Sequence, residues 1–127
     1  MASAVLDASA LLAFLHQEPG GEKVVPVLSR CVMSAVNLAE TYSQLARQGA
    51  ALHAASHQIQ RLQIPIIPFD NGQAILTASL HNITRGQGLS LGDCVCLALG
   101  MSQKAIVVTA DRRWTALPID VEIVQIR

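Results

Sequence analysis

Apolar residues of this chain fall in short runs that alternate with longer amphipathic stretches. The short runs predict buried strands at residues 4–6, 31–33, 64–69, 105–108 and 121–126. The stretches between them predict helices over residues 8–16, 22–29, 35–48, 51–63, 71–85 and 91–101. Strands that alternate with helices are typical of an α/β domain with a parallel sheet. No repeat or linker interrupts the pattern, so we expect one domain over residues 1–127.

Polar residues at the ends of these elements support the same boundaries. Ser34 and Ser90 stand where N-caps are expected, and Asp70 with Gln73 three residues later predicts a capping box. Pro65 and Pro68 place the third strand at an edge of the sheet, because proline cannot donate to a central ladder. The last strand is expected at an edge as well.

The composition describes a folded, aliphatic protein. Apolar residues make up 51% of the chain and charged residues 14%, which excludes intrinsic disorder. Only 3% of the residues are aromatic, so the core must consist of Leu, Ile, Val and Ala, with Trp114 as a packing anchor. No run approaches the roughly 20 apolar residues of a membrane span. Residues 1–16 lack the basic segment of a secretory signal.

The three cysteines, Cys31, Cys94 and Cys96, are odd in number, and two of them form a C-x-C pair. This arrangement matches neither a disulfide framework nor a zinc site. Buried thiols in a reducing compartment are the expected state, and together with the missing signal and membrane segments they predict a cytoplasmic protein.

Four of the nine acidic residues fall where predicted strands end or predicted helices begin. Asp7 ends the first strand, Asp111 follows the strand at 105–108, and Asp93 lies in the first turn of its helix. Strand C-termini and helix N-termini of right-handed β-α-β units share one edge of the sheet. Glu40 lies about 9 Å along its helix from that edge, a depth that its long side chain partly recovers. We therefore expect all four acids to line one cleft.

Each acid also has a purely structural interpretation. Asp7 could cap its helix, and Asp93 could form a capping box with Ser90. Asp111 could be a turn residue, and Glu40 could belong to a solvated stripe on its helix. That stripe consists of Asn37, Glu40, Gln44 and Arg47. However, several carboxylates at one edge repel each other and raise each other's pKa values, which proteins tolerate mainly where a cation binds.

Four segments around these acids resemble, in order and in spacing, the PIN-domain family, and specifically the VapC toxins of type II toxin–antitoxin systems. The segments are 5–12 (VLDASALL), 34–40 (SAVNLAE), 89–94 (LSLGDC) and 107–112 (VVTADR). The resemblance implies a three-layer α/β/α sandwich with a five-stranded parallel sheet of order 3-2-1-4-5. It also implies an RNA substrate, a small cognate antitoxin and a homodimer, to which helices in 35–63 and 70–84 are expected to contribute.

The resemblance further implies a metal-dependent endoribonuclease that uses Mg²⁺ or Mn²⁺. The four acids match the family's acidic residues by position, and small hydroxyl residues match beside the first and last of them. The implied catalytic and metal-binding residues are Asp7, Glu40, Asp93 and Asp111, with Ser9 and Thr109 in support. We expect Asp7 and Asp93 to be the principal ligands, because Mg²⁺ prefers hard oxygen ligands and keeps several waters.

The net charge of zero has a different meaning if these acids bind metal. Without them the chain carries nine basic and five acidic residues, an excess of four positive charges. RNA would then meet a mildly basic surface. Arg112 and Arg113 directly follow the last acid and are candidates for phosphate contacts, with a solvated loop pair as the alternative.

Other function classes make different predictions. A PIN-fold module that only binds RNA or a protein partner would show no metal-dependent cleavage. Phosphatases of the haloacid dehalogenase type carry Asp-x-Asp after the first strand, where this chain has Asp7, Ala8 and Ser9. Receiver domains need an acidic pair there and a late lysine, and neither is present.

Overall fold

A five-stranded, all-parallel sheet forms the centre of the computed structural model, which describes residues 3–114 and 116–127. Its strands are β1 (Ala4–Leu6), β2 (Cys31–Ser34), β3 (Ile66–Ile67), β4 (Ile106–Thr109) and β5 (Ile123–Gln125). They are ordered β3-β2-β1-β4-β5. The predicted α/β class, the order 3-2-1-4-5 and the two edge positions are confirmed.

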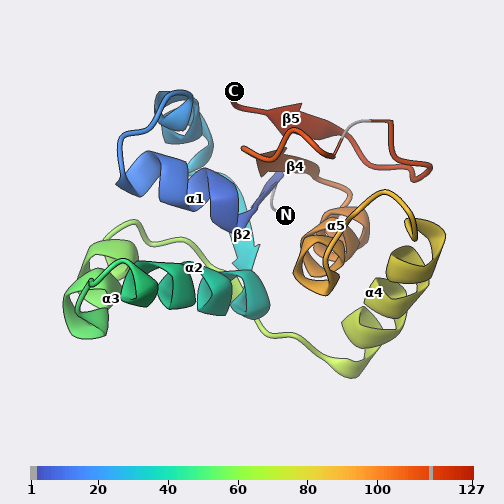
Figure 1. Cartoon of the computed structure of the whole chain (residues 1–127), viewed down its shortest axis with the longest axis horizontal. Helices are drawn as coiled ribbons and strands as arrows, with labels where there is room; N and C mark the ends of the chain where they lie inside the picture. The colour runs from blue at the N-terminus through green and yellow to red at the C-terminus, as the bar shows by residue number, and fades with distance from the viewer. Residues whose placement is uncertain (1–2, 115) are drawn as a thin grey trace.

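Helices cover both faces of this sheet (Figure 1). They are α1 (Ala8–Leu15), the 3₁₀ helix η1 (Gly21–Val27), α2 (Ala35–Arg47), α3 (Leu52–Gln60), α4 (Asn71–Ile83) and α5 (Leu91–Gln103). The first four lie on one side of the sheet in Figure 1, and α4 and α5 lie on the other. Within the described residues, no helix combines the length and apolar character needed to cross a membrane.

Alternate strand residues supply two separate cores. Because successive strand side chains point to opposite faces, Ala4 and Leu6 pack beneath α1, η1, α2 and α3, whereas Val5 packs against α5. Helix α5 is buried from Cys94 to Gly100 and packs against the sheet and against α4. Trp114, 1% exposed, joins this second core, as expected of a packing anchor. The three cysteines are buried free thiols, as predicted.

Several predicted elements differ from the structure. The last strand, predicted over 121–126, covers only Ile123–Gln125. The segment predicted as a helix over 22–29 is a 3₁₀ helix, which begins after Gly20 in a left-handed conformation and contains Pro26. Helix α3 ends at Gln60 and does not reach residue 63. The strand predicted over 64–69 shortens to two residues, because Pro65 and Pro68 flank it and have no N–H to donate.

The cap predictions have mixed outcomes. The Ser34 hydroxyl accepts a hydrogen bond from the backbone N–H of Val36, which confirms its N-cap role. Asp70 accepts from the backbone N–H of Gln73, but the Gln73 side chain donates to the carbonyl of Pro68. The capping box predicted there is therefore only half formed. The box begun by Ser90 is complete.

Candidate active site

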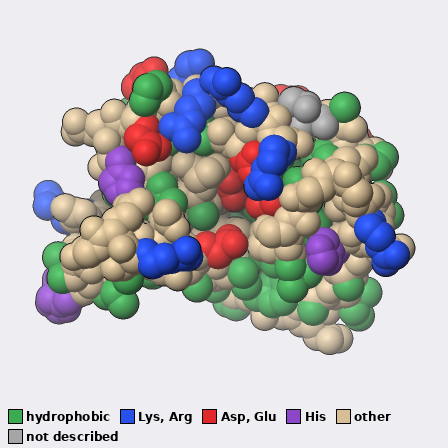
Figure 2. Space-filling view, viewed as in Figure 1, with side chains coloured by type: hydrophobic (Ala, Val, Ile, Leu, Met, Phe, Trp, Pro, Cys, Tyr) green, Lys and Arg blue, Asp and Glu red, His purple; other side chains and the backbone are tan. Residues whose placement is uncertain are grey.

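One cleft of about 680 Å³ collects all four predicted acids. Asp7 lies directly after β1, and Asp111 lies two residues after β4. Asp93 comes from the first turn of α5, and Glu40 from the second turn of α2. In the space-filling view, acidic side chains gather in a hollow in the middle of the face, with basic side chains on several sides (Figure 2). The parallel topology explains this convergence, because strand ends and helix starts meet at one edge.

Asp7 is buried, at 5% exposure, and is held by two hydroxyl groups. The Ser9 hydroxyl donates to Oδ2 of Asp7 at 2.5 Å, and the Thr109 hydroxyl donates to the same oxygen at 2.9 Å. No side-chain cap bond links Asp7 to α1. Asp7 therefore occupies the N-cap position of α1, but its side chain does not cap the helix. Among the described residues Oδ1 accepts no hydrogen bond, so this oxygen is available to a ligand in the cleft.

The pKa of Asp7 is raised to about 6. Burial is the main cause, since it disfavours the charged carboxylate. Hydrogen bonds from Ser9 and Thr109 lower the pKa in part, and the negative charges of Asp93 and Glu40 raise it further. Repulsion between the acids, the cause that the sequence suggests, thus ranks behind desolvation.

Ser9 and Thr109 also fix the backbone around the last acid. Their hydroxyl oxygens are 3.1 Å apart. The backbone N–H of Ala110 donates to the Ser9 hydroxyl at 2.9 Å, and the N–H of Asp111 donates to the Thr109 hydroxyl at 3.0 Å. These bonds tie the end of β4 to the start of α1. The two hydroxyl residues predicted beside the first and last acids thus contact Asp7 directly.

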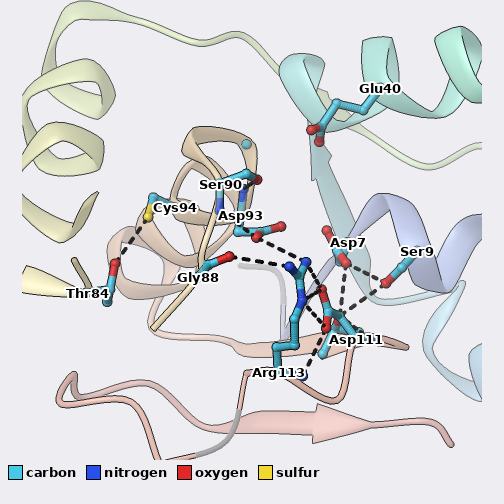
Figure 3. Close-up of polar contacts among 12 residues, drawn as sticks. Asp7, Ser9, Glu40, Thr84, Gly88, Ser90, Asp93, Cys94, Asp111 and Arg113 are labelled. Carbon is cyan, nitrogen blue, oxygen red and sulfur yellow. Dashed lines mark hydrogen bonds and ion pairs between the residues drawn. The ribbon is translucent and has the colours of Figure 1, made fainter. Parts of the chain in front are cut away.

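Asp93 both caps helix α5 and lines the cleft. Its Oδ2 accepts the backbone N–H of Ser90 at 2.8 Å, and its own N–H donates to the Ser90 hydroxyl at 3.1 Å. This reciprocal pair is the capping box that the sequence allowed. The box fixes the side chain at the cleft (Figure 3). Among the described residues, Oδ1 accepts no hydrogen bond.

Glu40 is held by a residue that the sequence places on a solvated stripe. Asn37 is fully buried, and its side-chain amide donates to Oε1 of Glu40 at 2.7 Å and to the carbonyl of Gly92 at 3.1 Å. Asn37 thereby joins α2 to the start of α5. The stripe interpretation is wrong for Asn37. The only feature of the sequence that could have indicated this contact is the position of Asn37 one helical turn before Glu40.

Gly92 is a second residue that sequence analysis missed. A Cβ atom at this position would collide with the carboxylate of Glu40, so only glycine leaves room for that carboxylate in its present position. We expect Gly92→Ala to reduce the RNA cleavage that the family resemblance implies about tenfold or more, because it displaces Glu40. Helix stability should be unchanged or improve by up to about 1 kcal/mol, because alanine favours helix. Turnover and thermal melting of the same preparation measure the two effects separately.

Gly72→Ala is the matched control, since a Cβ there meets only Asp70 at 3.6 Å, an ordinary contact outside the cleft. It should gain similar stability and keep full activity. Full activity in Gly92→Ala would mean that the position of Glu40 does not matter.

Asp111 is paired with Arg113. The Nε and Nη2 atoms of Arg113 donate to the two carboxylate oxygens of Asp111 at 2.6–3.1 Å, and its backbone N–H donates to Oδ1. Nη2 also lies 3.9 Å from Oδ2 of Asp93, and Nη1 donates to the carbonyl of Gly88 (Figure 3). The hydrogen bonds from Arg113 lower the pKa of Asp111. Asp111 is thus both a turn residue and a cleft residue.

The sequence matches one protein family over most of its length. The family model described as PIN domain matches residues 4–119. The chain belongs to the PIN-domain family. No curated protein matches the sequence.

Solved structures resemble this PIN domain over nearly its whole length. The DNA-bound VapBC of Salmonella typhimurium has a TM-score of 0.76 at 18% identity, and both chains are covered to 100%. A toxin–antitoxin complex from Klebsiella pneumoniae has a TM-score of 0.75 at 15% identity, with 98% of each chain covered. FitAcB of Neisseria gonorrhoeae has a TM-score of 0.71 at 22% identity, with 97% of each chain covered. At these identities the likeness establishes the fold.

The PIN domain brings together some predicted substrate residues and not others. Arg113 lines the cleft, whereas Arg112 donates to the backbone carbonyl of Arg127 at 3.4 Å and does not line it. Of the two neighbouring arginines, only Arg113 therefore lines the cleft.

The donor set of the cleft suits a hard cation bound partly through water. Within the described part of the chain, no three Asp, Glu, His or Cys side chains are arranged to hold an ion directly. Asp7 and Asp93 nevertheless each present a carboxylate oxygen without a hydrogen bond from a described residue, and Glu40 lines the same cleft. Mg²⁺ keeps several waters and needs only one or two carboxylates. The residues present therefore fit such an ion.

Proposed function

We propose that this PIN domain is a metal-dependent endoribonuclease and acts as the VapC-type toxin of a toxin–antitoxin pair. The observation that carries the proposal is the convergence of four carboxylates, Asp7, Glu40, Asp93 and Asp111, on one cleft. A buried carboxylate such as Asp7 costs stability, and a bound cation would offset that cost.

Each residue has a defined part in this proposal. Asp7 and Asp93 hold Mg²⁺ or Mn²⁺ through their free oxygens, and Glu40 and Asp111 act directly or through bound waters. Such an ion supplies an activated water and neutralises charge on the phosphodiester. Ser9 and Thr109 keep the Asp7 carboxylate in one orientation by donating to Oδ2.

Purified protein should cleave RNA in Mn²⁺ or Mg²⁺, stop in EDTA and recover when metal is restored. A gel assay on a pool of mixed-sequence RNA tests this, because the pool offers many sequences at once and the target need not be identified first. RNA that is bound but left intact in every metal would contradict the nuclease proposal. That outcome would favour a PIN-fold binding module.

Partners and location complete the proposal. The similar structures include toxin–antitoxin complexes, and we propose a small cognate antitoxin and a homodimer for this chain as well. Exposed apolar side chains, Leu52 on α3 and Ile75 and Ile83 on α4, lie on helices that we expect to contribute to the dimer. Light scattering tests the homodimer, and an active monomer at micromolar concentration would contradict it. Three buried free thiols support a cytoplasmic location.

A further inference from the structure

The cleft extends beyond the acids along one face of α2. Besides Glu40, this helix contributes Ser43, Gln44 and Arg47 to the lining. Glu40 and Arg47 are seven residues apart, so they lie on the same helix face and about 10 Å apart along the axis. Along α2 the wall of the cleft therefore changes from acidic at Glu40 to neutral and then to basic at Arg47.

Arg47 has no partner among the described residues. The described ion pairs join Arg113 to Asp93 and Asp111, and Arg127 to Glu18. Arg47 takes part in none of these pairs, and no described hydrogen bond uses its side chain. A cation in the last helical turn is stabilised by the helix dipole. That stabilisation does not require the cation to line a cleft.

Arg113 is the other arginine of the cleft, and its guanidinium is already engaged. It donates to both oxygens of Asp111 and to the carbonyl of Gly88. A substrate phosphate would have to compete with these bonds at Arg113 but not at Arg47. Arginine binds phosphate through two parallel, charge-assisted hydrogen bonds when its fork is free.

We infer that Arg47 binds a backbone phosphate of the RNA strand on the α2 side of the scissile bond. The inference rests on the proposed nuclease function and adds a substrate contact to it. The strand runs from the carboxylates along α2, and Ser43 and Gln44 offer neutral hydrogen-bonding groups between the two ends. Arg47 contributes to binding of the strand and not to the chemical step.

Kinetics on the mixed-sequence RNA pool in Mn²⁺ test this contact. Arg47→Gln should raise KM about tenfold and leave kcat unchanged, since one charge-assisted phosphate contact is lost. The slope of log binding constant against log salt should fall by about 0.7, the value for one phosphate contact to a single strand. Arg47→Lys should restore part of the affinity and the full slope.

Arg61→Gln is the matched control, because Arg61 is an exposed arginine at the end of α3 and does not line this cleft. It removes the same charge and should leave KM and the salt slope as in wild type. Equal KM values and equal salt slopes for Arg47→Gln and Arg61→Gln would overturn the inference. Wild-type protein that cleaves no RNA would instead defeat the proposed function. The Mn²⁺-induced rise in Tm should be the same in Arg47→Gln as in wild type.

Discussion

Asp93→Asn should lower the rate of the proposed metal-dependent RNA cleavage by at least about a hundredfold, because it removes the charge of a proposed metal ligand. Asparagine can still accept the backbone N–H of Ser90 through its amide oxygen, so the capping box that Asp93 completes need not be lost. The loss of activity should therefore occur without unfolding. Initial rates on one cleaved RNA, with circular dichroism of the same samples, measure both properties.

Asp70→Asn is the matched control for this variant. Asp70 caps α4 through the backbone N–H of Gln73 but does not line the cleft. Asparagine is as good an N-cap as aspartate, so activity and stability should both remain at the wild-type level. An Asp93→Asn variant as active as Asp70→Asn would show that Asp93 is only a helix cap.

Asp7→Asn should stabilise the metal-free protein at neutral pH. The pKa of Asp7 is raised from 3.8 to about 6, so the folded state binds a proton more readily than the unfolded chain. The stability that this proton contributes is complete below pH about 4 and is lost as pH rises through about 6. Above that range the cost is on the order of 3 kcal/mol. Asparagine avoids this cost and can still accept hydrogen bonds from Ser9 and Thr109.

Denaturant unfolding in EDTA at a series of pH values checks this result. The difference in free energy of unfolding between Asp7→Asn and wild type should be small near pH 4 and grow until about pH 7. Asp111→Asn is a control with the opposite sign. Arg113 lowers the pKa of Asp111, so that carboxylate stabilises the fold at neutral pH and loses the contribution in acid. An Asp7→Asn variant less stable than wild type at neutral pH would contradict the conclusion that burial of the Asp7 carboxylate costs stability.

The sequence predicted the acids of the cleft because their placement follows from topology. Asp7 and Asp111 follow strands, Asp93 follows a helix start, and the handedness of β-α-β units brings such positions to one edge. The same rule could not decide between a cap and a ligand for Asp93. The structure shows that the Asp93 side chain both forms the capping box and lines the cleft.

Residues that depend on packing between distant segments could not be predicted. Asn37 and Gly92 meet across 55 positions in the sequence, and only the approach of α2 to α5 gives them a common role. Hydrophobic spacing overestimated β3, because it does not count the hydrogen bonds that Pro65 and Pro68 cannot make. The sequence also treated Arg112 and Arg113 alike, although only Arg113 lines the cleft.

The most direct test of the proposed metal site is the shift in Tm that Mn²⁺ produces in wild type and in Asp93→Asn, each measured against EDTA. It needs no RNA substrate. Metal bound to the folded state should add about 2.7 kcal/mol at a hundredfold excess over Kd. We expect a clear rise in Tm for wild type and for Asp70→Asn, and a much smaller rise for Asp93→Asn. A wild-type Tm that is the same in Mn²⁺ as in EDTA would show that the four carboxylates do not form a metal site.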